Sequence, residues 1–275
     1  MRGQLRKRVK SALTYSLILL ILFYTLVPIV WIIEGSFKTH EQNSRVPPVW
    51  IFQPNFEAYD RISSRIFHFF SNSLMISVSS VLAAILVSIF AAYALSRFDV
   101  RRKRDIEVFI LSTRMGPAFA FIVPFYLIMR DLKLLDTQIA VILIYTAINV
   151  SFAVWILKGF IDEVPVEIED AALVDGCSRL KVLLYVTLPL VYPALIVTGT
   201  LGFITSWNEF LFAFILTREA AVTLPPAIAS NVSFMNIDWE AMCAYATVSM
   251  LPVLTLALLV RKHLARGLTL GAIKG

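Results

Sequence analysis

The sequence predicts an all-α membrane protein in which six transmembrane helices form one bundle and both termini are cytoplasmic. Of its 275 residues, 58% are hydrophobic and 16% are charged, and the mean hydropathy is +0.76. A soluble domain carries about 25% charged residues. The apolar residues gather in blocks of about 20, enough to cross a hydrocarbon layer roughly 30 Å thick. Short basic clusters flank these blocks, which is typical of membrane topology.

The first two apolar blocks are the most clearly bounded. A basic N-terminus, residues 1–11, precedes the first span, 12–33, which is too long for a cleaved signal peptide and is expected to be a retained anchor. Residues 35–71 are expected to form a polar, proline-containing loop whose aromatic residues lie at the lipid headgroups. The second span, 72–95, ends at the basic cluster 97–104, the strongest cytoplasmic marker in the chain.

Four further spans complete the bundle. The third contains Gly116 and Pro117, which interrupt its helical pattern. The predicted spans are 106–129, 137–157, 190–216 and 241–260, and a basic tail, 261–275, follows them. With the N-terminus inside, the inner segments hold 17 of the 25 Lys and Arg residues and the outer loops hold 7. The positive-inside bias therefore supports this orientation.

The polar stretch between the fourth and fifth spans is the main functional candidate. Pro165 suits a helix start, and acidic residues favour the first helical turn near the positive end of the helix dipole. Ala171 and Ala172 offer a flat surface to a partner, and Gly176 is suited to end the helix in a left-handed turn. The stretch 165–189 is thus expected to present a short acidic helix in the cytoplasm.

This stretch resembles a signature of the permease subunits of binding-protein-dependent ABC importers. That signature is Glu-Ala-Ala, three residues, Gly, nine residues, then Ile-x-Leu-Pro. Here Asp170-Ala171-Ala172 is followed at matching spacing by Gly176 and by Val186-Thr187-Leu188-Pro189. Asp at 170 and Val at 186 depart from the pattern but keep its chemistry. In that family the segment is the coupling helix, which docks in a groove of the ATPase subunit.

Further motifs resemble the maltose-type sugar permeases, in the shorter, six-span partner of the pair. They are the tail 267–275 and the runs 112–117 and 206–210. The resemblance implies a type I importer fold with a core domain, 72–260. It also implies a homologous longer permease, two ATPase subunits and a periplasmic or lipid-anchored solute-binding protein as partners. ATP and Mg would be bound by the ATPase subunits, so no cofactor is expected in this chain.

The resemblance carries over to two groups of residues. Those expected to couple to the ATPase are Glu169, Asp170, Ala171, Ala172, Asp175, Gly176, Val186, Leu188 and Pro189. Those of the tail expected to contact the ATPase subunits are Gly267, Leu268, Thr269, Gly271 and Lys274.

Polar residues within the spans are candidates for the substrate pathway or a gate, because charges there cost about 2.5–3.5 kcal/mol on insertion scales. Arg114 fits an anionic substrate contact, an inter-helix pair or a side chain that snorkels to the headgroups. Trp207, Asn208 and Glu209 suit a sugar, which stacks on an aromatic ring and hydrogen-bonds through its hydroxyls, or equally a helix-packing cluster. Asn149 is a weaker candidate of the same kind.

The sequence disfavours other function classes. It has no Gly-rich phosphate loop for ATP, no metal-ligand spacing among its three histidines, and no pattern for nucleic-acid binding. A membrane enzyme would need a cluster of acids or histidines near a span end, and the outer loops lack one. A permease for a non-sugar solute stays an alternative, and the identity of the solute stays open.

Overall fold

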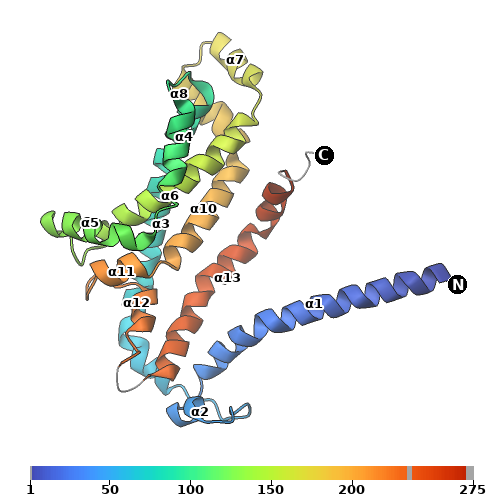
Figure 1. The fold of residues 1–275 in the computed structure, drawn as a ribbon, viewed down its shortest axis with the longest axis vertical. Helices are drawn as coiled ribbons and strands as arrows, with labels where there is room; N and C mark the ends of the chain where they lie inside the picture. The colour runs from blue at the N-terminus through green and yellow to red at the C-terminus, as the bar shows by residue number, and fades with distance from the viewer. Residues whose placement is uncertain (1, 234–236, 271–275) are drawn as a thin grey trace. The chain divides into compact units, whose positions relative to one another are not determined.

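Helices make up the regular structure of the described chain in this computed structural model, which covers residues 2–233 and 237–270. Figure 1 shows their order. The elements are α1 (Arg2–Gly35), α2 (His40–Ser44), α3 (Glu57–Arg97), α4 (Lys103–Ser112), α5 (Ala118–Asp131), α6 (Gln138–Asp162), α7 (Val166–Val174), α8 (Arg179–Val182), the π-helical turn η1 (Leu183–Thr187), α9 (Leu188–Leu190), α10 (Tyr192–Trp207), α11 (Leu211–Leu216), α12 (Leu224–Ala229) and α13 (Trp239–Leu270).

The chain divides into two compact units. Unit 1 comprises residues 1–67 and 227–250, and unit 2 comprises residues 68–226 and 251–275. The long helices α3 and α13 each contribute one part to unit 1 and the other part to unit 2.

Four helices of the described chain are long and apolar enough to cross a membrane. They lie at Lys10–Gly35, Glu57–Arg97, Gln138–Asp162 and Trp239–Arg261, and each corresponds to one of the predicted spans. A fifth candidate is the pair Arg179–Leu190 and Tyr192–Trp207, whose two helices meet at 77°.

The predicted third span differs from the structure, because it is divided into two helices. α4 has 10 residues and α5 has 14, and residues 113–117 separate them. Proline disfavours the α conformation in the residue before it, so the helix cannot run through Gly116 into Pro117. The fifth span is divided in the same way, since α10 ends at Trp207 and α11 begins at Leu211.

The predicted polar loop 35–71 is wrong in its second half. α3 begins at Glu57, well before the first apolar residues of the second span. The Asn55 side chain accepts a 2.8 Å hydrogen bond from the Glu57 N–H, and Glu57 and Asp60 occupy the first turn, where the helix dipole favours acids. Hydropathy alone marks only the apolar part of such a helix.

Unit 1 holds a buried cation in its loop. The Lys38 side chain is almost fully buried and forms a 3.1 Å ion pair with Glu34. Its ammonium lies 5.0 Å from the Trp31 ring centre and 4.9 Å from that of Phe52, within the range of a cation–π contact. These contacts fix the turn that follows α1.

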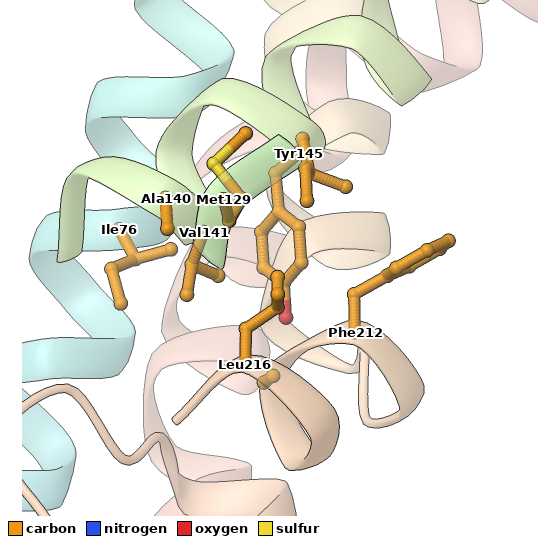
Figure 2. Packing of buried hydrophobic residues seen from close by; sticks show 9 residues of the cluster. Ile76, Met129, Ala140, Val141, Tyr145, Phe212 and Leu216 are labelled. Atoms are coloured by element: carbon orange, nitrogen blue, oxygen red, sulfur yellow. The ribbon is translucent and has the colours of Figure 1, made fainter. Parts of the chain in front are cut away.

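Unit 2 has two apolar cores. One joins α3, α5, α6 and α11, and Figure 2 shows Tyr145 at its centre, with the hydroxyl directed toward α11. The other joins the last turns of α3 and α6 to η1 and α10, with Leu157 and Leu183 among its buried members. Residues of the second core come both before and after α7 in the sequence, so this core positions the site described next.

Candidate functional site

The predicted acidic helix of the 165–189 segment is present as α7. Pro165 occupies its N-cap position, and Glu167 and Glu169 lie in its first turn. At its other end Gly176 has φ +86°, a left-handed conformation that glycine adopts without strain. The N–H groups of Gly176 and Cys177 bond the carbonyls of Leu173 and Ala172, which is a Schellman motif. The proline start and the glycine end are both confirmed.

Glu169 is fully buried, although it lies in a surface helix. Its carboxylate forms a 3.0 Å ion pair with Nε of Arg97, at the end of α3. It also accepts hydrogen bonds from the hydroxyls of Tyr93 (3.1 Å) and Thr187 (2.8 Å). A buried carboxylate is tolerated only when it is paired and hydrogen-bonded, and these three groups meet that requirement.

The Arg97 side chain also forms hydrogen bonds at the C-terminal end of α6. One terminal nitrogen of its guanidinium donates 2.8 Å hydrogen bonds to the carbonyls of Ile161 and Val164. These carbonyls lie at and just beyond the last turn of α6, where the helix no longer continues to supply the usual i+4 N–H donors. Arg97 therefore joins α3, α6 and α7, whereas the sequence pattern marked it only as part of a topological cluster.

The remaining residues of the segment face outward or are partly covered. Asp170, Ala171, Asp175 and Gly176 are exposed, and Ala172 is half-buried. Val174 is 87% exposed, so α7 presents small, acidic and apolar side chains together. After the turn, Val186 and Leu188 are half-buried and Pro189 is exposed.

The Val-Thr-Leu-Pro part of the signature coincides with an irregular helix. Residues Leu183–Thr187 form the π-helical turn η1, and the Leu188 N–H bonds the carbonyl of Leu183. Pro189 has no N–H to donate, so regular α-helical bonding cannot continue through it. The chain bends shortly after this point, before α10 begins.

Glu209, a candidate for the substrate pathway, has its carboxylate engaged within the chain. It accepts hydrogen bonds from the N–H groups of Leu211 (2.9 Å) and Phe212 (3.1 Å), at the start of α11. It also accepts a 2.7 Å bond from the Tyr145 hydroxyl. The residue thus caps α11 and ties that helix to α6.

The other candidates within the spans fall into two groups. Asn149 and Trp207 are buried: Asn149 donates a 2.8 Å hydrogen bond to Ser206, and Trp207 stacks on Phe203. Asn208 and Arg114 are exposed. Asn208 donates to the carbonyl of Ile204, and Arg114 lies over the ring of Phe152 at 4.8 Å.

Asp136 is a structural residue that no pattern in the sequence singles out. Its carboxylate accepts hydrogen bonds from the backbone N–H groups of four consecutive residues, Arg218 to Ala221, at 2.9–3.2 Å. Burial raises the pKa of Asp136, but the four N–H donors lower it more, so the pKa lies below its usual value.

The Asn72 side chain strengthens the same junction. It donates to the carbonyls of Ala220 and Val222 at 3.0 Å and accepts a 2.6 Å bond from Gln138. Asp136 and Asn72 together hold the segment that follows α11 against α3 and the start of α6.

Part of the predicted tail site lies outside the described residues. Gly271 and Lys274 fall there. Gly267, Leu268 and Thr269 lie within the α13 helix, but their side chains are outside the described set. The tail contacts therefore stay predictions.

Comparisons with known proteins agree on one family. Residues 84–270 match the family model described as the inner membrane component of binding-protein-dependent transport systems. The chain is 31% identical to the diacetylchitobiose uptake system permease protein of Streptomyces coelicolor, over 93% of this chain and 94% of that protein. It is 31% identical to the trehalose/maltose transport system permease protein of Thermococcus litoralis, over the full length of both.

A third relative and a solved structure extend this agreement. The sulfoquinovosyl glycerol transport system permease protein of Agrobacterium fabrum is 32% identical over 91% of this chain and 89% of that protein. A crystal structure of a bacterial ABC transporter that imports alginate has the same fold, with a TM-score of 0.78, 24% identity and 94% and 97% of the two chains covered. The chain therefore belongs to the family of inner-membrane components of binding-protein-dependent transport systems.

Proposed function

We propose that this chain is the permease subunit of an ATP-driven importer for a sugar or sugar-like solute. The observation that carries the proposal is α7, a short helix at the matched signature that presents exposed small and acidic residues and is fixed internally by Glu169. Relatives named for diacetylchitobiose, trehalose or maltose, and sulfoquinovosyl glycerol support a carbohydrate or glycoside as the solute.

In this proposal an ATPase subunit docks on the exposed side of α7. Asp170, Ala171 and Asp175 lie on the surface of the helix, and Ala172 is half-covered. The small side chains allow close approach of a partner, and Val174 supplies apolar area at the end of the helix. Gly176 then turns the chain away without a side chain that would obstruct docking.

A homologous, longer permease would complete the membrane channel. In the apolar window of α1 none of the residues is buried within this chain, and in that of α13 17% are. Apolar helix faces without intrachain partners need lipid or another permease to cover them. The complex would thus hold two permeases, two ATPase subunits and a periplasmic or lipid-anchored binding protein.

The proposed orientation places both termini and α7 in the cytoplasm. The positive-inside bias of the Lys and Arg residues supports this arrangement. It brings α7 to the side of the membrane where the ATPase subunits bind ATP, and it extends the tail that includes Gly267 and Leu268 on the same side.

The exposed polar residues within the spans are the better candidates for the substrate pathway. Arg114 and Asn208 keep exposed side chains in this chain. Asn149, Trp207 and Glu209 instead make contacts between its helices. We assign the first pair to the pathway and the second set to the support of the bundle, a division that rests on their burial and bonding.

The test is ATPase activity of the complex reconstituted with its binding protein and candidate carbohydrates. The Gly176→Asp variant should lose at least ten-fold of the solute-stimulated activity and of solute uptake. Gly159→Ala is the matched control, because an added Cβ at either glycine meets no atom within 4 Å, yet only Gly176 has a positive φ. Full activity of Gly176→Asp would refute the docking assignment. Stimulation only by a non-carbohydrate solute would refute the sugar class.

A further inference from the structure

Glu169 cannot belong to the docking surface, because its side chain has no exposed area. α7 has nine residues, all within the described chain, and Glu169 is the only one of them that is buried. Besides its two chain connections and the half-buried side chains of Ala172 and Leu173, the helix is attached to the body of unit 2 by this one carboxylate. Apolar packing fixes most helices, but no apolar side chain of α7 is fully buried.

The partners of this carboxylate come from two other elements. We call Tyr93, Arg97, Glu169 and Thr187 the Glu169 cluster. Tyr93 and Arg97 lie in the last two turns of α3, and Thr187 ends η1, just before the bend into α10. Arg97 in addition holds the carbonyl end of α6. Figure 1 shows α7 at the same end of unit 2 as α8, beyond the last turn of α6.

We propose that Glu169 is a positioning residue that transfers the movement of α7 to α3 and α10. This inference rests on the proposed function, since it presumes that an ATPase subunit moves α7. The carboxylate of Glu169 accepts hydrogen bonds from the hydroxyls of Tyr93 and Thr187 and pairs with the Arg97 guanidinium. Hydrogen bonds to a buried charged group are directional and strengthened by the low dielectric, so they resist sliding better than apolar contacts do. A displacement of α7 is passed through Tyr93 and the Arg97 ion pair to α3, and through Thr187 to the bend before α10.

This arrangement separates two tasks within one helix. Exposed residues such as Asp170 meet the ATPase subunit, whereas Glu169, the preceding residue, is buried within the chain. Loss of the first task should prevent assembly. Loss of the second should leave assembly intact and lower both the solute-stimulated ATPase activity and transport.

The test compares variants of these two neighbouring acids in the reconstituted complex. Glu169→Gln removes the charge and introduces an NH2 group that faces donors, at almost constant size. We expect it to co-purify with the ATPase subunits within two-fold of the wild type and to lose at least ten-fold of solute-stimulated ATPase activity and uptake. Asp170→Arg should instead reduce co-purification. Glu163→Gln, at an exposed acid that lies outside α7 at the end of α6, is the matched control and should change neither property.

A second variant separates positioning from mere stability. In Arg97→Met/Glu169→Gln both buried charges are absent, so the double variant should unfold at a higher temperature than Arg97→Met alone. Stimulated transport should nevertheless stay at least ten-fold below that of the wild type, because the link from α7 to α3 is missing. Recovery of transport together with stability would overturn the inference, as would loss of co-purification by Glu169→Gln in a folded chain.

A spectroscopic measurement reports on the link directly. Spin labels at Val174, on α7, and at Leu86, on α3, occupy exposed positions of unit 2. With Cys177 and Cys243 replaced by Ser, the distance distribution should broaden in Glu169→Gln and keep its width in Glu163→Gln. An unchanged width in Glu169→Gln would contradict the inference. The proposed function would fail independently, through a wild-type complex that no carbohydrate stimulates.

Discussion

The carboxylate of Asp136 accepts a 2.9 Å hydrogen bond from the backbone N–H of Arg218, and the next three N–H groups bond the same carboxylate. Asp136 itself has φ +58°, and its own N–H bonds the carbonyl of Leu216. Successive N–H groups that converge on one anion form a nest, which fixes the conformation of the backbone that supplies them. One side chain thus shapes the connection that follows α11.

Asp136→Ala should lower the free energy of unfolding at neutral pH by about 1–3 kcal/mol, because backbone donors lose a charged acceptor. The pKa of Asp136 is lowered from its ordinary value of 3.8, so its contribution is present above that value and is lost as pH falls through the folded-state pKa. Thermal unfolding of the detergent-purified protein should thus show a gap between wild type and variant at pH 7 that narrows below pH 3.8. A gap that does not change with pH would contradict this account.

Gly176→Ala and Gly159→Ala should change stability in opposite directions. A Cβ at φ +86° is strained, at a cost of roughly 1–2 kcal/mol, even though the space around Gly176 is open. Gly159 lies within α6, where alanine is favoured over glycine by about 1 kcal/mol. Differential scanning fluorimetry of the two variants measures both effects. Equal shifts would show that the turn at Gly176 is not left-handed in the native protein.

Tyr145→Phe should weaken the attachment of α11 to α6. The lost hydroxyl donates a 2.7 Å bond to Glu209, and a hydrogen bond to a charged group contributes about 1.5–3 kcal/mol. Tyr192→Phe, at an exposed tyrosine, is the control and should stay within about 0.5 kcal/mol of the wild type. The double variant with Glu209→Gln should be less destabilised than the sum of the two single variants, because both changes remove the same bond.

Membrane-impermeant thiol labelling tests the proposed orientation. In a background with Ser at positions 177 and 243, Ile51→Cys and Val174→Cys each place a thiol at a highly exposed position, 95% and 87% in the native side chains. Ile51→Cys should react in intact spheroplasts, and Val174→Cys only in inverted vesicles. The reverse pattern would place α7 outside the cell and remove the basis for ATPase docking.

The helical class and four long spans were predictable because hydropathy reports the burial of whole helices in lipid. The breaks were harder to predict. Gly116 and Pro117 marked one of them, but the end of α10 has no proline and depends on Glu209, which bonds the N–H groups of the next helix. From the sequence alone, a glutamate in an apolar segment fits a residue of the substrate pathway and a helix cap equally well. Only its hydrogen bonds in the structure distinguish the two roles.

The signature positions were predictable, whereas the direction of each side chain was not. Glu169 and Asp170 are adjacent acids of one short helix, yet one is buried and the other exposed. The partner of Glu169 lies far away in the sequence, and Arg97 belongs to a basic cluster whose topological role already accounted for its charge. Pairings between distant residues depend on tertiary structure, which a single sequence does not display.

The exposed side chains of α7 pack little against the rest of the chain. They can therefore be exchanged for those of a related permease without repacking of either apolar core. We expect that grafting positions 170, 171, 172 and 175 from such a relative would redirect this subunit to the relative's ATPase while its own solute pathway is kept. The residues that select the ATPase subunit and the residues that select the solute could then be exchanged independently within one chain.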